Sequence, residues 1–341
     1  MNVCEPHLHS SGSFLCQYRN SAAEELLRDE TVIAVISSGD RSSAGADPRH
    51  LHYVLPPLGP SSVHEVWYAP GRVAAGRDGF LRWSSCEELL FAAIEIDEGD
   101  HTSLKTASHH AYVQLLDFSE RRGYPAIVRV WNYLPRINQG SGDEERYRQF
   151  CLGRQQAFNE RRYKASAYPS ACAVGHNGHR TIIYLRAARA PIKHIENPRQ
   201  ESAYHYPRQY GPASPSFARA TQVDWRRGRQ IFISGTASIV GHESRCPHDL
   251  AGQLQVTLEN LDILLHESAR VSQSDNLPAM DLLKVYVRHP LHFAPVQRAI
   301  CDRFPGVPAV YLQGDICREE LLVEVDGVAT LGDCATRPLP Y

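Results

Sequence analysis

The segment 321–328, LLVEVDGV, predicts a β-strand that carries two acidic side chains. Because side chains alternate along a strand, Leu322, Glu324 and Asp326 should share one face. If that face meets solvent, Glu324 is an ordinary surface acid, which is the commoner situation for a strand glutamate. If the face lines a pocket, burial and the like charge of Asp326 raise the pKa of Glu324. Its carboxyl group could then donate a proton near neutral pH.

Two arginine and tyrosine pairs could bind carboxylates. Tyr147 and Arg154 lie in a predicted helix, and Tyr206 and Arg219 lie in a proline-rich segment. A guanidinium binds a carboxylate bidentately and a phenol adds one directed hydrogen bond. Single arginines are more often solvated or ion-paired on the surface, so the pairs become a site only if the fold brings them together.

Other kinds of reaction chemistry lack their sequence motifs. There is no Walker loop, no dinucleotide fingerprint after a strand, no C-x-x-C motif and no G-x-S-x-G motif. Cys317 lies seven positions before Glu324, and such a cysteine is more often a small buried side chain than a reactive thiol. We therefore expect no cofactor and no metal, and a reaction carried by ordinary acids, tyrosines, arginines or a thiol.

The composition favours a globular protein with a small-molecule partner. The 341 residues suffice for two domains, and no apolar run is long enough to cross a membrane. The start, MNVCEPHLHSSGS, lacks the features of a secretion signal, and nine scattered cysteines do not form a disulfide framework, so we expect a cytoplasmic location. A formal charge of −2 gives no footprint for nucleic acid. The sequence does not indicate an oligomeric state.

Hydrophobic periodicity predicts an α/β (α+β) fold built from two copies of one unit. The order strand, helix, strand, helix, strand is expected at 89–96, 104–119, 125–133, 145–162 and 182–185. It recurs at 231–240, 250–268, 282–288, 293–304 and 309–313, and the strand 321–328 comes next. VRVWNYLP in the first copy parallels VYVRHP in the second, although chance alternation is the competing explanation.

We therefore expect an N-terminal domain at 1–190, an interdomain segment at 191–222 and a C-terminal domain at 223–341 that carries Glu324. Each domain should be a mixed sheet with two helices on one face, with strands 32–37 and 63–68 added to the first. Four prolines argue against regular structure in 193–221, and its aromatic residues argue against disorder. A segment packed across the domain interface is a suitable wall for a pocket.

Several long blocks resemble one known family, the chorismatases, over 123–329. They are RVWNYLPRIN, GDEERYRQFCLGR, HIENPRQESAYHYPRQYGPASPSFARAT, FISGTASIVGHES and GDICREELLVEVDG. Chorismatases convert chorismate to pyruvate plus a cyclohexadiene diol or a hydroxybenzoate. The resemblance implies two tandem units like the Rid-type imine deaminases, in agreement with the internal repeat.

On the matching positions, the resemblance implies that Glu324 protonates the enolpyruvyl methylene group of chorismate. Tyr147, Arg154, Tyr206 and Arg219 would hold its two carboxylates, and no cofactor would be needed. The oxocarbenium ion formed by protonation would be stabilised by the fixed carboxylates and by Glu324.

The product depends on the fate of this oxocarbenium ion. The subgroup that makes 3-hydroxybenzoate resembles this chain in having a cysteine at the position of Cys317, so we favour 3-hydroxybenzoate and pyruvate. The alternative is hydrolysis to a trans-dihydroxycyclohexadiene carboxylate and pyruvate, and 4-hydroxybenzoate also stays open. A more distant alternative is a Rid-type imine deaminase or a protein that binds small carboxylates.

Overall fold

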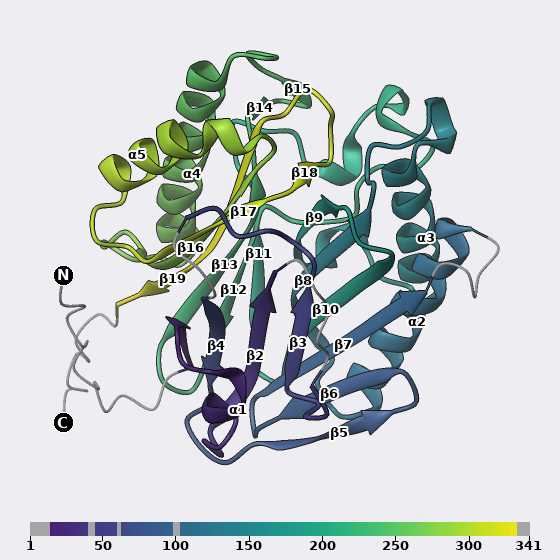
Figure 1. Cartoon of the computed structure of the whole chain (residues 1–341), viewed down its shortest axis with the longest axis vertical. Coiled ribbons are helices and arrows are strands. Elements are labelled where there is room, and N and C mark those ends of the chain that lie inside the picture. The colour runs from purple at the N-terminus through teal and green to yellow at the C-terminus, as the bar shows by residue number, and fades with distance from the viewer. Residues whose placement is uncertain (1–13, 40–44, 60–62, 98–102, 333–341) are drawn as a thin grey trace.

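The structure, a computed structural model, describes residues 14–39, 45–59, 63–97 and 103–332, which form three large sheets, one two-stranded sheet and their covering helices (Figure 1). The first repeat is a seven-stranded sheet in the spatial order β18, β9, β8, β10, β7, β6, β5. Its strands are β5 (Ala74–Asp78), β6 (Leu81–Ser85), β7 (Leu89–Asp97), β8 (Ala126–Pro135), β9 (Ser170–His176), β10 (Arg180–Ala188) and β18 (Asp315–Ile316). Helices α2 (Leu104–Arg121) and α3 (Arg146–Glu160) cover one face.

The second repeat is a six-stranded sheet in the spatial order β11, β12, β13, β19, β16, β17. Its strands are β11 (Ile192–Ile195), β12 (Ala220–Asp224), β13 (Arg229–Thr236), β16 (Ala279–Val287), β17 (Ala309–Gln313) and β19 (Val323–Leu331). Helices α4 (Leu250–Val271) and α5 (Phe293–Arg303) cover one face. Asp249 caps α4, where its side chain accepts a hydrogen bond from the backbone of Ala251.

Both sheets are mixed, and the topology of one repeats in the other. The pair β8 and β9 is parallel in the first sheet, and the pair β16 and β17 is parallel in the second, whereas their other pairs are antiparallel. In each case a helix lies between the two parallel strands in the chain, as a parallel connection requires. The expectation of an α/β fold with two tandem units, each a mixed sheet with two helices on one face, is confirmed.

One expectation for the early strands is wrong. Segments 32–37 and 63–68 do form strands, but they do not extend the first unit. They belong to a separate four-stranded sheet, in the spatial order β1 (Leu15–Arg19), β4 (His64–Tyr68), β2 (Val32–Ser38) and β3 (His50–Tyr53), with the short helix α1 (Ala23–Leu26). Strands β5 and β6 extend the first unit instead.

A central hydrophobic core joins the three sheets on the faces away from α2 to α5. It includes Trp131 and Tyr184 from the first unit, Phe232 and Tyr286 from the second, and Trp67 from the N-terminal sheet. Strands β8, β10, β16 and β19 are therefore buried on both faces, and a polar side chain on their inner face lies far from bulk solvent.

Three local features differ from the sequence expectations. Strand β9 was not predicted, because SACAVGH has few large β-branched or aromatic residues. The strand expected at 231–240 is split into β13 and the short strand β14 (Ile239–Val240), which pairs with β15 (Glu243–Ser244). The proline-rich segment is irregular only between β11 and β12, where it holds the single 3-10 turns η4 (Ala203–His205) and η5 (Arg208–Tyr210).

Across the described ranges, each helix is too short or too polar to cross a membrane.

Candidate active site

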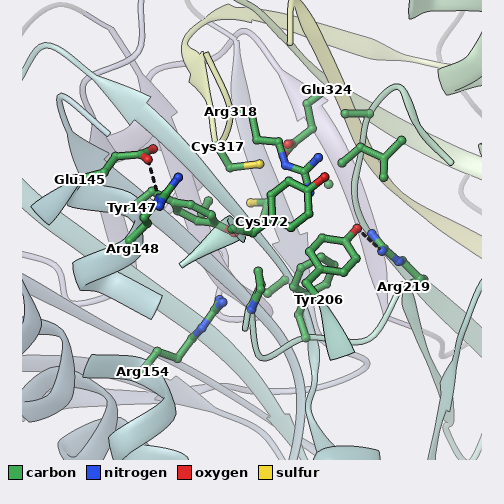
Figure 2. A pocket seen from close by; sticks show the side chains of 18 residues that line it. Glu145, Tyr147, Arg148, Arg154, Cys172, Tyr206, Arg219, Cys317, Arg318 and Glu324 are labelled. Atoms are coloured by element: carbon green, nitrogen blue, oxygen red, sulfur yellow. Dashed lines mark hydrogen bonds and ion pairs between the residues drawn. The ribbon is translucent and has the colours of Figure 1, made fainter. Parts of the chain in front are cut away.

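A cavity of about 790 Å³, including its open mouth, lies where the two units meet. All six residues singled out from the sequence line it, and Figure 2 shows them around one space. They come from α3 (Tyr147, Arg154), the proline-rich segment (Tyr206, Arg219), the bend after β18 (Cys317) and β19 (Glu324). The fold therefore brings together residues that are up to 177 positions apart, from 147 to 324.

Glu324 lies at the inner end of this cavity and is 4% exposed. Its neighbours Val323 and Val325 pack into the core beneath α4 and α5, so strand alternation turns Glu324 away from the helices. Among the described residues, its Oε1 atom is buried without a hydrogen-bond partner. The interpretation of Glu324 as a solvated surface acid is wrong.

Burial raises the pKa of Glu324 to about 8, and the like charge of Asp326 acts in the same direction, against a smaller opposing effect of Arg129. Asp326 accepts a hydrogen bond from Arg129 at 2.9 Å and another from the Tyr286 hydroxyl at 3.2 Å. These two bonds fix the Asp326 carboxyl group two positions along the strand from Glu324. Glu324 is therefore mainly protonated at neutral pH, which is the state that the sequence attached to the pocket alternative.

Gly235 shapes the surroundings of the Glu324 carboxyl group. A Cβ atom at this position would overlap Glu324 Oε1 and would lie 3.1 Å from the Cβ atom of Cys172. The register of β13 against β19 shifts between Ile233 and Thr236, so the backbone at Gly235 bulges. Close backbone contact at Gly235 thus contributes to the burial of Glu324, whereas Leu322 precedes β19 and does not line the cavity.

Tyr147 and Arg154 form one polar wall of the cavity. Arg154 is 1% exposed, and its Nη2 atom donates to the sulfur of Cys151, at 3.7 Å. Its Nε atom has no partner, and Arg154 forms no ion pair with any described residue. A fully buried guanidinium without a counter-ion is costly, and a carboxylate placed in the cavity would remove that cost.

Tyr206 and Arg219 form a second polar wall. Arg219 is 4% exposed and its Nη2 atom donates to the Tyr206 hydroxyl at 2.7 Å and to the carbonyl of Glu201 at 2.8 Å. Its Nε atom is buried and unpartnered within the described part of the chain. Burial raises the pKa of nearby Glu196 to about 7, and Arg219 opposes this shift. Arg219 is therefore a second cation suited to an incoming anion.

Cys317 and Cys172 line the same cavity as Glu324 and form an uncharged part of its wall. Burial raises the pKa of Cys317 to about 12, and the Glu324 carboxyl group adds to the shift while Arg318 opposes it. Burial also raises the pKa of Cys172. Both side chains are thus neutral thiols at physiological pH, so they exclude water from the wall rather than act as thiolate nucleophiles.

The sequence reasoning missed further cavity residues, chiefly Arg318, Tyr210, Cys172 and the ion pair of Arg148 with Glu145 at 2.9 Å. Arg318 and Tyr210 lie within the chorismatase-like blocks, so those blocks held a signal that single-residue reasoning did not use. Cys172 was missed because strand β9 was missed. Among the described residues, no group of three or more His, Cys, Asp or Glu side chains is arranged to hold a metal.

The geometry suits acid catalysis on a small molecule with two carboxylates. A protonated carboxyl group and two neutral thiols lie on one side, and buried guanidinium groups without counter-ions face the same space. Such fixed charges can orient an anionic substrate and stabilise positive charge next to its carboxylates.

Comparisons with known proteins point to one family. Residues 65–187 match the family described as "Chorismatase FkbO/Hyg5-like, N-terminal". A 3-hydroxybenzoate synthase of Streptomyces hygroscopicus is 38% identical over 277 residues, which are 77% of this chain and 80% of that protein. A chorismatase of the same organism is 35% identical and covers 92% of this chain and 93% of its own. A crystal structure of a chorismatase superimposes with a TM-score of 0.85 at 31% identity and covers 93% of this chain and 98% of its own.

Proposed function

Because this chain belongs to the FkbO/Hyg5-like chorismatase family, we propose that it converts chorismate to 3-hydroxybenzoate and pyruvate, with Glu324 as the proton donor. The observation that carries the proposal is the placement of a protonated, unpartnered Glu324 in the same cavity as the unpaired guanidinium groups of Arg154 and Arg219. The same cavity supports chorismate as the substrate, since chorismate has one carboxylate on its ring and another on its enolpyruvyl group.

Binding orients the substrate before any bond breaks. Arg154 with Tyr147, and Arg219 with Tyr206, each offer a guanidinium and a phenol to one carboxylate. The carboxylates replace the missing counter-ions, so binding satisfies donors that are otherwise buried without partners. A substrate with one carboxylate would leave one of these arginines uncompensated.

Glu324 then transfers its proton to the methylene carbon of the enolpyruvyl group. The carbon–carbon double bond supplies the electron pair for the new C–H bond, and the adjacent carbon becomes an oxocarbenium ion. The Glu324 carboxylate left behind is unpaired and buried, so it stabilises the cation strongly across a short, dry space. Addition of one water to this ion and cleavage of the ether bond would release pyruvate.

The two possible ring products differ in how much water their formation consumes. The dihydroxycyclohexadiene carboxylate retains the ring hydroxyl, so its formation consumes one water. For 3-hydroxybenzoate, the ring also loses one hydrogen and the hydroxyl group as water, so no net water is consumed. The proton that the added water releases as the carbonyl group of pyruvate forms restores the acid form of Glu324. The neutral thiols of Cys317 and Cys172 support the second outcome, because an uncharged wall beside the ring favours loss of water from the ring.

Product identification tests the proposal directly. Purified protein and chorismate should give pyruvate, measured with coupled lactate dehydrogenase, and 3-hydroxybenzoate, identified by chromatography against standards. Pyruvate with a dihydroxycyclohexadiene carboxylate or 4-hydroxybenzoate would refute the product assignment but not the acid chemistry. Folded protein that releases no pyruvate, and instead hydrolyses imines, would refute the proposed function as a whole.

A further inference from the structure

The cavity contains a third guanidinium group to which the proposed reaction gives no role. Arg318 is next to Cys317 in the bend between β18 and β19, and its side chain lines the cavity. Glu324 and Arg318 shift the pKa of the Cys317 thiol in opposite directions, and all three side chains line the same cavity. Figure 2 shows Arg318, Cys317 and Glu324 together on one side and Arg154 on the opposite side.

The backbone that carries Arg318 is fixed by one partly buried arginine, Arg288. Arg288 Nη2 donates to the carbonyls of Ile316 and Arg318 at 3.1 and 2.9 Å, and its Nε atom donates to the carbonyl of Leu321 at 2.8 Å. Arg288 also pairs with Asp315 at 2.7 Å. The bend therefore holds Arg318 at a constant place relative to Glu324, as a substrate-binding residue requires.

The side chain of Arg318 is oriented by stacking and by one hydrogen bond. Its guanidinium carbon lies 3.9 Å from the ring centroid of Tyr210 and 5.3 Å from that of Tyr206. Its Nη1 atom donates to the hydroxyl of Ser244 at 3.0 Å. These contacts use the planar shape of the guanidinium and leave its other N–H groups for a ligand.

The charge of Arg318 has no counter-ion in the described part of the chain. Arg154, Arg219 and Arg318 all line the cavity without an ion pair to a described carboxylate, whereas Arg148 at the same cavity pairs with Glu145. Carboxylates are available nearby, because Glu320 accepts a hydrogen bond from Ser244 at 2.6 Å, yet Arg318 does not pair with it. The guanidinium group of Arg318, on the Glu324 side of the cavity, therefore has no ion-pair partner among the described residues.

The proposed reaction determines which substrate group meets this cation. The enolpyruvyl carboxylate is bonded to the carbon next to the methylene group that Glu324 protonates, so it must lie beside Glu324 during proton transfer. We propose that Arg318 binds the enolpyruvyl carboxylate of the substrate, while Arg154 across the cavity binds the ring carboxylate. This assignment rests on the proposed function, and it extends the polar wall of Tyr206 and Arg219 towards the proton donor.

Fragments of the substrate separate the two carboxylate sites. Pyruvate reports on the enolpyruvyl side and benzoate on the ring side, each as a competitive inhibitor of chorismate cleavage. Cleavage is monitored by chromatography of the ring product when pyruvate is the inhibitor, and by lactate dehydrogenase when benzoate is. Arg318→Gln should raise the inhibition constant of pyruvate about tenfold or more and leave that of benzoate within about twofold, and Arg154→Gln should do the reverse.

Two further variants keep the test decisive. Arg303→Gln removes a charge that is paired with Asp262 away from the cavity, so both inhibition constants should stay within about twofold of the wild type. Arg318→Lys keeps the charge but loses the planar stacking on Tyr210, so pyruvate binding should weaken by less than in Arg318→Gln. If Arg318→Gln does not fold, the lysine variant decides, because unchanged pyruvate binding in it overturns the proposal.

The outcomes also separate this inference from the proposed function. A wild-type protein that releases no pyruvate from chorismate refutes the function itself. A wild-type protein that is active, with an Arg318→Gln variant that binds pyruvate normally or loses both fragments equally, refutes only the assignment of Arg318.

Discussion

Strands β10 and β19 take equivalent places in the two units, and one position on them shows how the units diverge. Tyr184 of β10 pairs with Trp131 of β8, and Glu324 of β19 pairs with Tyr286 of β16. Trp131 and Tyr286 are matched by the parallel segments VWNYLP and VYVRHP. The first unit therefore has a tyrosine where the second has the proposed proton donor.

The surroundings of Tyr184 are filled and paired. Its ring stacks on Trp131 with the centroids 4.8 Å apart, and its hydroxyl accepts a hydrogen bond from Lys284 Nζ at 3.3 Å. Lys284 is 1% exposed and forms an ion pair of 2.6 Å with Glu65 of the N-terminal sheet. Burial alone would lower the pKa of Lys284, but the Glu65 carboxylate raises it, so both groups stay charged.

Glu324 instead lines the cavity, which takes the place that the aromatic stack of Tyr184 has in the first unit. Its Oε1 atom has no hydrogen-bond partner among the described residues. The difference teaches that burial alone does not mark a functional charge in this molecule. Lys284 and Glu65 are as buried as Glu324 and Arg154, but they neutralise each other and join two sheets. Glu324 and Arg154 instead line the cavity without an ion pair to any described residue.

The largest expected effect comes from removing the unpaired acid. Glu324→Gln keeps the shape of the side chain but cannot donate the proton, so kcat should fall by about 100- to 10,000-fold. The matched change Tyr184→Phe removes one hydroxyl at the equivalent position and should leave kcat unchanged. Rates of pyruvate release measure both effects. Equal losses of kcat in the two variants would contradict the proposal that only the second unit supplies a proton donor at this position.

The next largest effect should come from breaking the paired charges. Glu65→Gln leaves the buried ammonium group of Lys284 uncompensated, so the free energy of unfolding should fall by about 3–5 kcal/mol. Urea unfolding at neutral pH measures the loss. The double change Glu65→Leu with Lys284→Met removes both charges and should recover most of that stability, while a double variant as unstable as Glu65→Gln would show that packing rather than charge is responsible.

A smaller change in stability should result from removal of an unpaired cation. Arg154→Met deletes a buried charge without stranding a partner, so its free energy of unfolding should stay within about 1 kcal/mol of the wild type or rise. Substrate binding should weaken about tenfold to hundredfold, because one carboxylate loses its charged donor. Urea unfolding and KM for chorismate provide the two measurements. A stability loss as large as that of Glu65→Gln would show that Arg154 stabilises the fold, as the paired charges of Lys284 and Glu65 do.

How far the sequence could predict this arrangement differs between the two regions. The helical periodicity and the similarity between the segments VWNYLP and VYVRHP predicted the two tandem units. This was possible because the order of apolar and polar residues along a helix or strand depends mainly on local burial. The face of Glu324 stayed open between solvent and pocket, because alternation along β19 says which residues share a face but not what covers it. Only the packing of the two units decides that question.

The N-terminal sheet and the cavity rim were less predictable for the same reason. Segments 32–37 and 63–68 have strand patterns, but sheet membership depends on long-range pairing that a single sequence does not encode locally. Gly235 lies in a predicted strand, and its contact with Glu324 results from a bulge between distant segments. The pairing of Lys284 with Glu65 likewise joins residues from different sheets.

The smallest expected effect is a change in the pH dependence of stability, and it tests the protonation of Glu324 without substrate. The pKa of Glu324 is about 8 in the folded chain and has an ordinary value of 4.5. Between these values the folded state binds more protons than the unfolded state, so this group's stabilising contribution is complete below the lower value and is lost as pH rises through the higher one. Glu196, with a pKa of about 7, and Asp281, with a pKa of about 6, contribute with the same sign.

Glu324→Gln should therefore flatten, but not abolish, the fall in stability between about pH 5 and 9, since Glu196 and Asp281 remain. Urea midpoints across this range in wild type and variant measure the difference. The same ionisation should reduce wild-type kcat as pH rises through about 8, because the anionic form of Glu324 cannot donate a proton. A variant whose stability falls as steeply as that of the wild type would mean that Glu324 is ionised in the free protein. Glu324 on β19 would then be a buried charged group, like Lys284 and Glu65 beside Tyr184.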